Sequence, residues 1–127
     1  MTPDQKESLR RRLLDMRSEL LAEMRRKNAQ AASLIDEGVA DYGDQALTDT
    51  LKEYLHLLSD SKRDTLLRID AALDRLAADD YGTCLDCGQP IAFKRLEIEP
   101  QTRFCVDCRQ RREEEEAMRG EPGTGKL

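Results

Sequence analysis

The four cysteines of the sequence form two pairs with the spacing of a metal-binding site. Cys84 and Cys87 form the first pair, and Cys105 and Cys108 form the second pair after 17 intervening residues. Two Cys-x-x-Cys pairs let four thiolates converge as a tetrahedron on one zinc ion, with Zn–S distances of about 2.3 Å. A catalytic zinc keeps one position open for water, whereas four cysteines close the coordination sphere. The sequence therefore predicts one structural Zn²⁺ ion.

Two other chemistries are compatible with paired cysteines, a dithiol redox switch and an iron–sulfur centre. The matched spacing of the two pairs favours zinc over both. A structural zinc contributes on the order of 10 kcal/mol or more to folding, which suits a segment with almost no core. We expect a tight turn at Gly88 and an extended chain over residues 91–99, between the pairs.

Upstream of the cysteines, two long stretches without Gly or Pro carry apolar or small residues, most of them three or four positions apart, and Lys27 breaks the first series. The stretches span residues 6–36 and 47–76. This spacing predicts two helices of about 30 residues, each with one apolar stripe. Because neither stripe is buried alone, the helices are expected to pack as an antiparallel coiled-coil hairpin. The stripe residues are Leu9, Leu13, Met16, Leu20, Met24, Ala31 and Leu34 in the first helix and Leu47, Leu51, Tyr54, Leu58, Thr65, Ile69, Ala72 and Leu76 in the second.

The predicted fold is therefore mainly α and has three parts. Residues 1–78 form the long antiparallel helical hairpin, and residues 79–119 form a small four-Cys zinc-finger module with a C-terminal helix over about residues 107–119. Residues 120–127 have the composition of a disordered tail.

The connection between the two predicted helices, residues 36–49, is strongly acidic. It contains five Asp or Glu residues and no Lys or Arg. The structural interpretation is that Asp41 and Asp44 solvate a turn and that Asp44 caps the second helix. The functional interpretation is that this acidic tip contacts a partner.

The overall composition excludes several classes of protein. A formal net charge of −5 argues against a general nucleic-acid binder, which needs a surplus of Lys and Arg. No apolar run approaches the roughly 20 residues of a membrane span, and the N-terminus does not resemble a signal peptide, so we expect a cytoplasmic protein. The sequence contains a single histidine, His56, and no nucleophile–base pair that spacing alone would identify as catalytic. Phosphate-loop and Rossmann glycine patterns are also absent from the sequence. The sequence predicts that the protein is not an enzyme.

Several motifs resemble the DksA/TraR family of bacterial transcription regulators. In the zinc segment they are residues 81–88 (YGTCLDCG), residues 95–97 (RLE), Pro100 and residues 105–108 (CVDC). At the tip, residues 41–46 (DYGDQA) are similar to that family's Asp-x-x-Asp-x-Ala pattern, through Asp41, Asp44 and Ala46. The resemblance extends over about residues 5–115 and corresponds to a short form without the N-terminal extension of longer members.

The resemblance implies a function and a partner. It implies that the hairpin enters the secondary channel of RNA polymerase and presents Asp41, Asp44 and Ala46 near the active site, while the zinc module stays outside against the rim. Initiation would then be modulated without sequence-specific DNA binding. We expect the protein to act as a monomer.

The resemblance also bears on regulation by guanosine tetraphosphate. Responsive members place basic residues around the zinc module, and Arg68 and Arg109 match two such positions. Ser61 and Glu99 occupy two others where those members have Arg, and an acid in an anion site opposes binding. The comparison with responsive members therefore implies a weak or absent response.

Two alternative functions remain open from the sequence. One is a transcript-cleavage factor, which also delivers carboxylates to the polymerase but recruits a metal for RNA hydrolysis. The other is a zinc-ribbon adaptor that binds a different protein or a nucleic acid.

Overall fold

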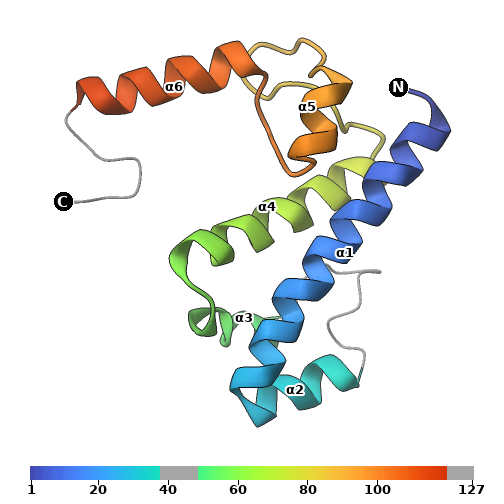
Figure 1. Ribbon diagram of the computed structural model, residues 1–127, viewed down its shortest axis with the longest axis vertical. Helices are drawn as coiled ribbons and strands as arrows, with labels where there is room; N and C mark the ends of the chain where they lie inside the picture. Colours follow the sequence, from blue (N-terminus) through green and yellow to red (C-terminus); the bar gives the residue numbers. More distant parts are fainter. Residues whose placement is uncertain (38–48, 120–127) are drawn as a thin grey trace. The chain divides into compact units, whose positions relative to one another are not determined.

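The structure, a computed structural model, describes residues 1–37 and 49–119 (Figure 1). The described residues contain six α-helices, one short 3₁₀ helix and a single isolated β-bridge. The chain divides after Tyr81 into two compact units. The predicted fold class, a helical hairpin followed by a four-cysteine module and a helix, is confirmed.

The first helix, α1 (Pro3–Lys27), begins at a strong local start signal. The Thr2 hydroxyl accepts a hydrogen bond from the Gln5 backbone N–H at 3.1 Å, and the Gln5 side chain accepts one from the Thr2 N–H at 2.9 Å. This capping box satisfies two backbone donors that the first turn leaves free, and Pro3 supplies a φ angle suited to the first helical position. The helix is 25 residues long, or about 37 Å at the α-helical rise.

The predicted continuous helix over residues 6–36 is wrong at one point, Asn28. Asn28 adopts an extended conformation (φ −153°, ψ 126°) between α1 and α2 (Ala29–Asp36). Its side-chain oxygen accepts hydrogen bonds from the Gln30 and Ala31 N–H groups at 2.8 and 3.1 Å. A short polar side chain of this kind competes with the helical backbone bonds, so the apolar periodicity continues while the helix does not.

The second predicted helix, over residues 47–76, is also interrupted. Its described part contains α3 (Asp49–Lys52), the 3₁₀ helix η1 (Leu55–Leu57) and α4 (Asp60–Ala77). Ser59 begins α4 by accepting a hydrogen bond from the Lys62 N–H at 3.2 Å. The side chain of Ser59 thus caps a new helix where the apolar pattern alone predicted an unbroken one.

Helices α1 and α4 form the antiparallel hairpin. Three ion pairs show the direction of pairing, since Lys6 meets Asp79 at 2.6 Å, Arg17 meets Asp70 at 2.8 Å and Glu23 meets Lys62 at 2.7 Å. Residue numbers rise on one helix as they fall on the other, as the hairpin prediction requires.

Apolar residues of this unit are buried along both α1 and α4. A further group of buried apolar residues lies near the helix interruptions at Asn28 and Ser59. We call this group the distal cluster. Its buried members are Leu21, Met24, Leu51, Leu58 and Leu66. Eight residues of the predicted stripes are buried. They are Leu9, Leu13, Met24, Ala31, Leu51, Leu58, Ile69 and Ala72. Leu21, Leu66 and Leu73 are buried but were not in the predicted stripes, because the buried face of each helix is wider than one residue per turn and includes neighbours of the stripe positions.

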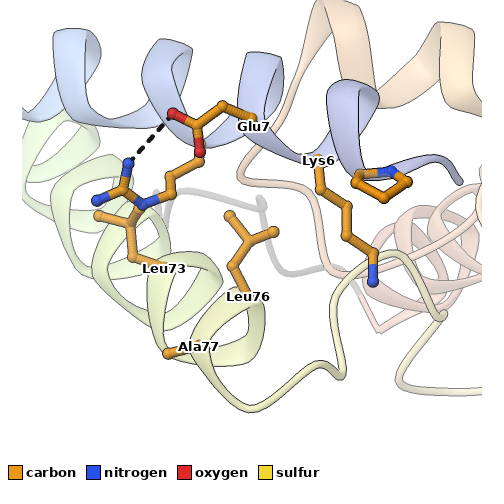
Figure 2. A pocket seen from close by; sticks show the side chains of 7 residues that line it. Lys6, Glu7, Leu73, Leu76 and Ala77 are labelled. Carbon is orange, nitrogen blue, oxygen red and sulfur yellow. Dashed lines mark hydrogen bonds and ion pairs between the residues drawn. The ribbon is translucent and has the colours of Figure 1, made fainter.

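A groove of about 300 Å³ lies where α1 begins and α4 ends (Figure 2). Leu73 and Leu76 extend from α4 toward α1, and Lys6 and Glu7 stand on the α1 side. Glu7 pairs with Arg10 at 3.4 Å. This end of the hairpin therefore combines apolar contacts with ion pairs at its rim.

The hairpin also buries a charged pair that the apolar pattern did not predict. Arg17 and Asp70 are only 4% and 6% exposed, and the Arg17 Nε donates to the Asp70 Oδ1. Burial raises the pKa of the Asp70 carboxyl, and the attraction of Arg17 opposes this rise only in part. The pair thus joins the helices at a site where a lone charge would be costly.

We predict that Arg17→Met lowers the free energy of unfolding by about 3 kcal/mol at neutral pH, because it leaves a buried carboxylate without its cation. The loss should shrink on acidification. Since the folded-state pKa of Asp70 is raised, the folded protein holds the proton more tightly, and its stability falls as pH rises through that pKa. Urea unfolding followed by circular dichroism measures both effects. As the control, Arg17→Met/Asp70→Leu removes both charges and should restore stability near wild type; equal losses in the two variants would contradict the prediction.

No helix within the described ranges is long and apolar enough to cross a bilayer.

Candidate metal centre

The first cysteine pair lies on a tight turn in the second unit. The turn is closed by an antiparallel bridge between Thr83 and Pro90 and by a hydrogen bond from the Cys84 N–H to the Gln89 carbonyl at 2.9 Å. The Gly88 N–H donates to the Cys84 carbonyl at 3.0 Å. Gly88 has a φ of +75°, a conformation that residues with a Cβ rarely adopt. The predicted turn at Gly88 is therefore confirmed.

The chain between the two pairs contains a helix where an extended segment was predicted. Helix α5 (Phe93–Ile98) occupies most of residues 91–99. Leu96 is fully buried while Ile98 is 79% exposed, so only one face of this short helix packs inward. Alternating apolar residues in a segment this short do not distinguish a strand from a helical turn, which explains the wrong prediction.

The second pair lies at the start of α6 (Val106–Met118), where a helix of about this length was predicted. Cys105 is the N-cap residue and Cys108 lies in the first turn. The positive end of the helix dipole favours a negative charge at this place, which suits thiolates.

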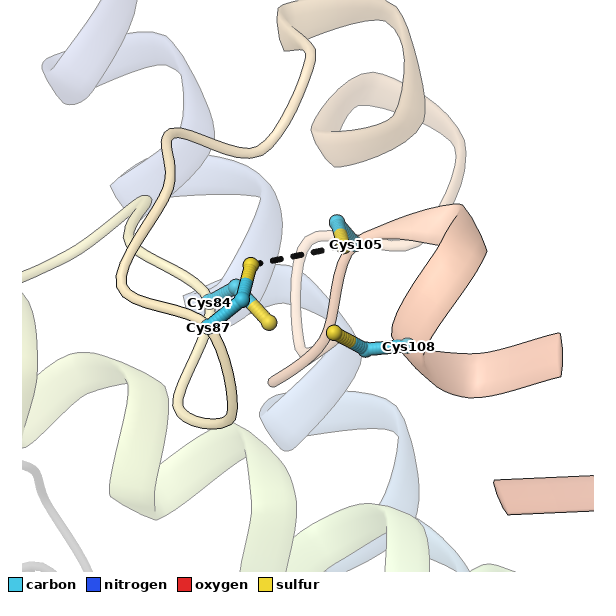
Figure 3. A group of neighbouring side chains, drawn as sticks. All are labelled: Cys84, Cys87, Cys105 and Cys108. Carbon is cyan, nitrogen blue, oxygen red and sulfur yellow. Dashed lines mark hydrogen bonds between the residues drawn. The ribbon is translucent and has the colours of Figure 1, made fainter. Parts of the chain in front are cut away.

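The four sulfur atoms point toward one another from these two segments (Figure 3). All four lie within 4.8 Å of one another, and the sulfurs of Cys87 and Cys105 are 3.9 Å apart. A tetrahedron with Zn–S distances of about 2.3 Å has sulfur–sulfur edges of about 3.8 Å. The four cysteines that the sequence selected are thus brought together at a spacing that fits a zinc ion.

The thiols in this cluster differ in how readily they ionise. Burial opposes ionisation of Cys84, but backbone N–H groups of Cys105, Cys87 and Asp86 outweigh it and lower the pKa to about 6. Burial raises the pKa of Cys108 to about 12, and its hydrogen bonds with the other three thiols add to the rise. Four adjacent thiolates therefore need a cation among them, and zinc supplies that charge when bound.

Two arginines of α6 reach back toward the cysteine pairs. The Arg111 Nη2 donates to the Cys108 sulfur at 3.1 Å. The Arg112 Nε and Nη2 donate to the two carboxylate oxygens of Asp86, at 2.5 and 2.7 Å. These hydrogen bonds hold the pKa of Asp86 below its ordinary value. The roles of Asp86, Arg111 and Arg112 were not predicted from the sequence. The spacing of the two arginines, three and four positions after Cys108, is the available signal, because it places them on the Cys108 face of a helix.

The proposed tip residues Asp41, Asp44 and Ala46 lie outside the described residues. The expectations that Asp44 caps a helix and that residues 120–127 are disordered likewise concern residues outside the described ranges.

Comparison with known proteins places these features in a family. Residues 79–114 match the prokaryotic DksA/TraR C4-type zinc finger. Over 118 residues, the chain is 31% identical to the RNA polymerase-binding transcription factor DksA of Caulobacter vibrioides, with 93% of this chain and 82% of the relative covered. The solved structure of transcription factor DksA2 from Pseudomonas aeruginosa is 32% identical and has a TM-score of 0.62, covering 92% of this chain and 89% of its own. The DnaK suppressor protein of Agrobacterium tumefaciens C58, also 32% identical, has a TM-score of 0.58 and covers 82% of this chain and 90% of its own.

The fold and these similarities define a class of protein in which a helical hairpin is followed in the same chain by a C4-type zinc finger. The protein belongs to the DksA/TraR family. The relatives named as DksA are transcription factors, which agrees with the prediction that the chain is a regulator and not an enzyme.

We predict that the purified protein carries one zinc ion per chain and that Cys108→Ser carries substantially less, because three thiolates leave the coordination sphere open. Elemental analysis of protein purified under reducing conditions measures this. Chelation should expose the zinc segment to trypsin at Lys94, Arg95 and Arg103 while the hairpin stays resistant, since the two units are separately compact. A coloured, iron-containing sample would show that the metal is not zinc.

Proposed function

We propose that this chain is a zinc-containing regulator that binds RNA polymerase and modulates the initiation of transcription. The observation that carries the proposal is the alignment with the DksA of Caulobacter vibrioides, which is named as RNA polymerase-binding. Because that alignment spans 93% of this chain and 82% of the relative, it includes both the hairpin and the zinc finger. A match to the zinc finger alone would support only a shared metal site.

The finer proposal is that the hairpin enters the secondary channel of the polymerase. Helix α1 alone is about 37 Å long, which is enough to carry its far end well below a protein surface. The ion pairs from Lys6–Asp79 to Glu23–Lys62 tie α1 to α4 along this length, so the hairpin is supported as a unit. The distal cluster adds apolar contacts near the far end, where a plain two-helix coiled coil would be weakest.

The chemistry of the proposed tip is that of carboxylates. Asp41 and Asp44 would interact with Mg²⁺ or with the basic groups that hold Mg²⁺ and nucleotide in the polymerase active site. Ala46 is the third residue of the motif, and its small side chain leaves room for close approach. In this proposal the chain performs no reaction of its own and acts without sequence-specific DNA binding, as a monomer in the cytoplasm.

A weak or absent response to guanosine tetraphosphate is part of the proposal. The Arg109 Nη1 donates to both carboxylate oxygens of Glu99, at 2.9 and 2.7 Å, and its Nε donates to Glu113 at 3.2 Å. Arg68 pairs with Asp64 at 2.8 Å. An incoming phosphate would have to displace these carboxylates, which already neutralise the two arginines that the resemblance selects.

We predict that guanosine tetraphosphate has little or no influence on the effect of the protein on transcription. Glu99→Gln should increase any alarmone binding, because it removes one of the two carboxylates that neutralise Arg109. Binding to the complex of protein and polymerase can be measured by isothermal titration. A micromolar affinity in the wild type that disappears in Arg109→Ala would contradict this prediction.

The main test of the proposal uses the tip. Asp44→Asn should leave the fold and the affinity for RNA polymerase unchanged but remove most of the effect on transcription in vitro, because it deletes one tip charge. Asp49→Asn is the matched control. It removes an exposed carboxylate of the same acidic segment, outside the Asp-x-x-Asp-x-Ala motif, and should regulate like wild type.

The outcomes separate the alternatives. Normal regulation by Asp44→Asn would show that the tip assignment is wrong. Shortening of RNA in stalled polymerase complexes would identify a transcript-cleavage factor, and failure to bind polymerase with zinc present would leave the adaptor hypothesis.

A further inference from the structure

The two cysteine pairs face a problem of alignment. They come from segments separated by 17 residues, and four thiols must meet within 4.8 Å before a metal can hold them. A backbone hydrogen bond joins the segments, from the Leu85 N–H to the Arg103 carbonyl at 3.0 Å. Such a bond fixes a point of contact but does not by itself fix how the two segments are rotated about it.

A side-chain contact near the same point removes that freedom. Asp86 lies between the two cysteines of the first pair, and Arg112 lies one helical turn after Cys108 on α6. Two guanidinium nitrogens meet two carboxylate oxygens, at 2.5 and 2.7 Å. This paired geometry fixes the orientation of both groups as well as their distance.

The arginine is held from a second side by an aromatic ring. The guanidinium carbon of Arg112 lies 4.2 Å from the centre of the Phe104 ring, and Phe104 directly precedes Cys105. The Phe104 carbonyl accepts a hydrogen bond from the Arg95 Nε at 3.1 Å, which ties this residue to α5. Exposed ion pairs usually contribute little because both side chains must be ordered, but here stacking and the double hydrogen bond order Arg112 together.

We infer that the Asp86–Arg112 contact, seated on Phe104, is a positioning latch that aligns the two cysteine pairs and slows the loss of zinc. It joins the first pair to the helix that carries Cys108 and to the residue before Cys105. Neither Asp86 nor Arg112 is a metal ligand in this assignment. The inference rests on zinc at the four cysteines and is independent of polymerase binding.

The latch predicts a specific kinetic effect. Asp86→Asn and Arg112→Gln should each speed zinc release to a chelating dye about 10-fold, in line with the roughly 10- to 100-fold loss of metal affinity typical when residues that support metal ligands from outside the coordination sphere are replaced. Because both act through one contact, the double variant Asp86→Asn/Arg112→Gln should release zinc no faster than either single variant. Arg112→Lys keeps the charge but loses the paired geometry, so it should also release zinc faster than wild type.

The chain offers a matched control in Asp107, which occupies the position of Asp86 in the second cysteine pair. Among the residues that the structure describes, Asp107 makes no side-chain ion pair. Asp107→Asn therefore removes the same charge next to the same metal without touching the latch, and should change the release rate less than twofold. Circular dichroism should show unchanged hairpin helicity in every variant.

Three results would overturn the latch. They are equal release rates for Asp86→Asn and Asp107→Asn, multiplied effects in the double variant, and wild-type release from Arg112→Lys. The first would show a general effect of charge near the metal. A wild-type protein that holds no zinc would instead contradict the metal assignment, and normal latch kinetics in a protein that does not bind polymerase would contradict only the proposed function.

Discussion

Four cysteine sulfurs that lie within 4.8 Å of one another cannot all be thiolates unless a cation lies among them. The thiols differ accordingly, since backbone N–H groups outweigh burial and lower the pKa of Cys84 to about 6, whereas burial raises the pKa of Cys108 to about 12. The folding of the second unit depends on a cation that neutralises these thiolates. Its buried residues are few, and they include Cys84 and Cys108 themselves. A zinc ion held by the four cysteines would supply the stability that the small apolar core of a segment of this size does not provide.

The hairpin solves the same problem of a small core in a different way. Each of α1 and α4 has one buried face, and the two faces cover each other. The pair Arg17–Asp70 adds a directional contact to this apolar packing, since it is satisfied only when the two helices are in one register. The distal cluster then gathers α1, α3, α4 and η1 residues where the helices are interrupted. The unit is thus a hairpin with a small packed end, and not two uninterrupted rods.

The sequence determined the parts of this structure that depend on strong local rules. The Cys-x-x-Cys spacing identified the four sulfurs, Gly88 marked the turn, and the apolar periodicity identified the hairpin and most of its buried residues. The helix breaks were missed because periodicity reports which face is buried, whereas Asn28 and Ser59 interrupt helices through single side-chain hydrogen bonds. The contacts Arg17–Asp70 and Asp86–Arg112 were missed because they join residues 53 and 26 positions apart, which no local pattern links.

The proposed function requires that the acidic tip reach the inside of the polymerase. Site-directed crosslinking tests that claim most directly. A photo-crosslinking residue in place of Gln45, between Asp44 and Ala46, should crosslink to the polymerase subunits that form the active site when the zinc-loaded protein is mixed with the enzyme. A residue of the same kind in place of Glu114 on α6 should crosslink only to the outer surface. Crosslinks from position 45 that map only to the outside of the polymerase, or none at all, would contradict the account.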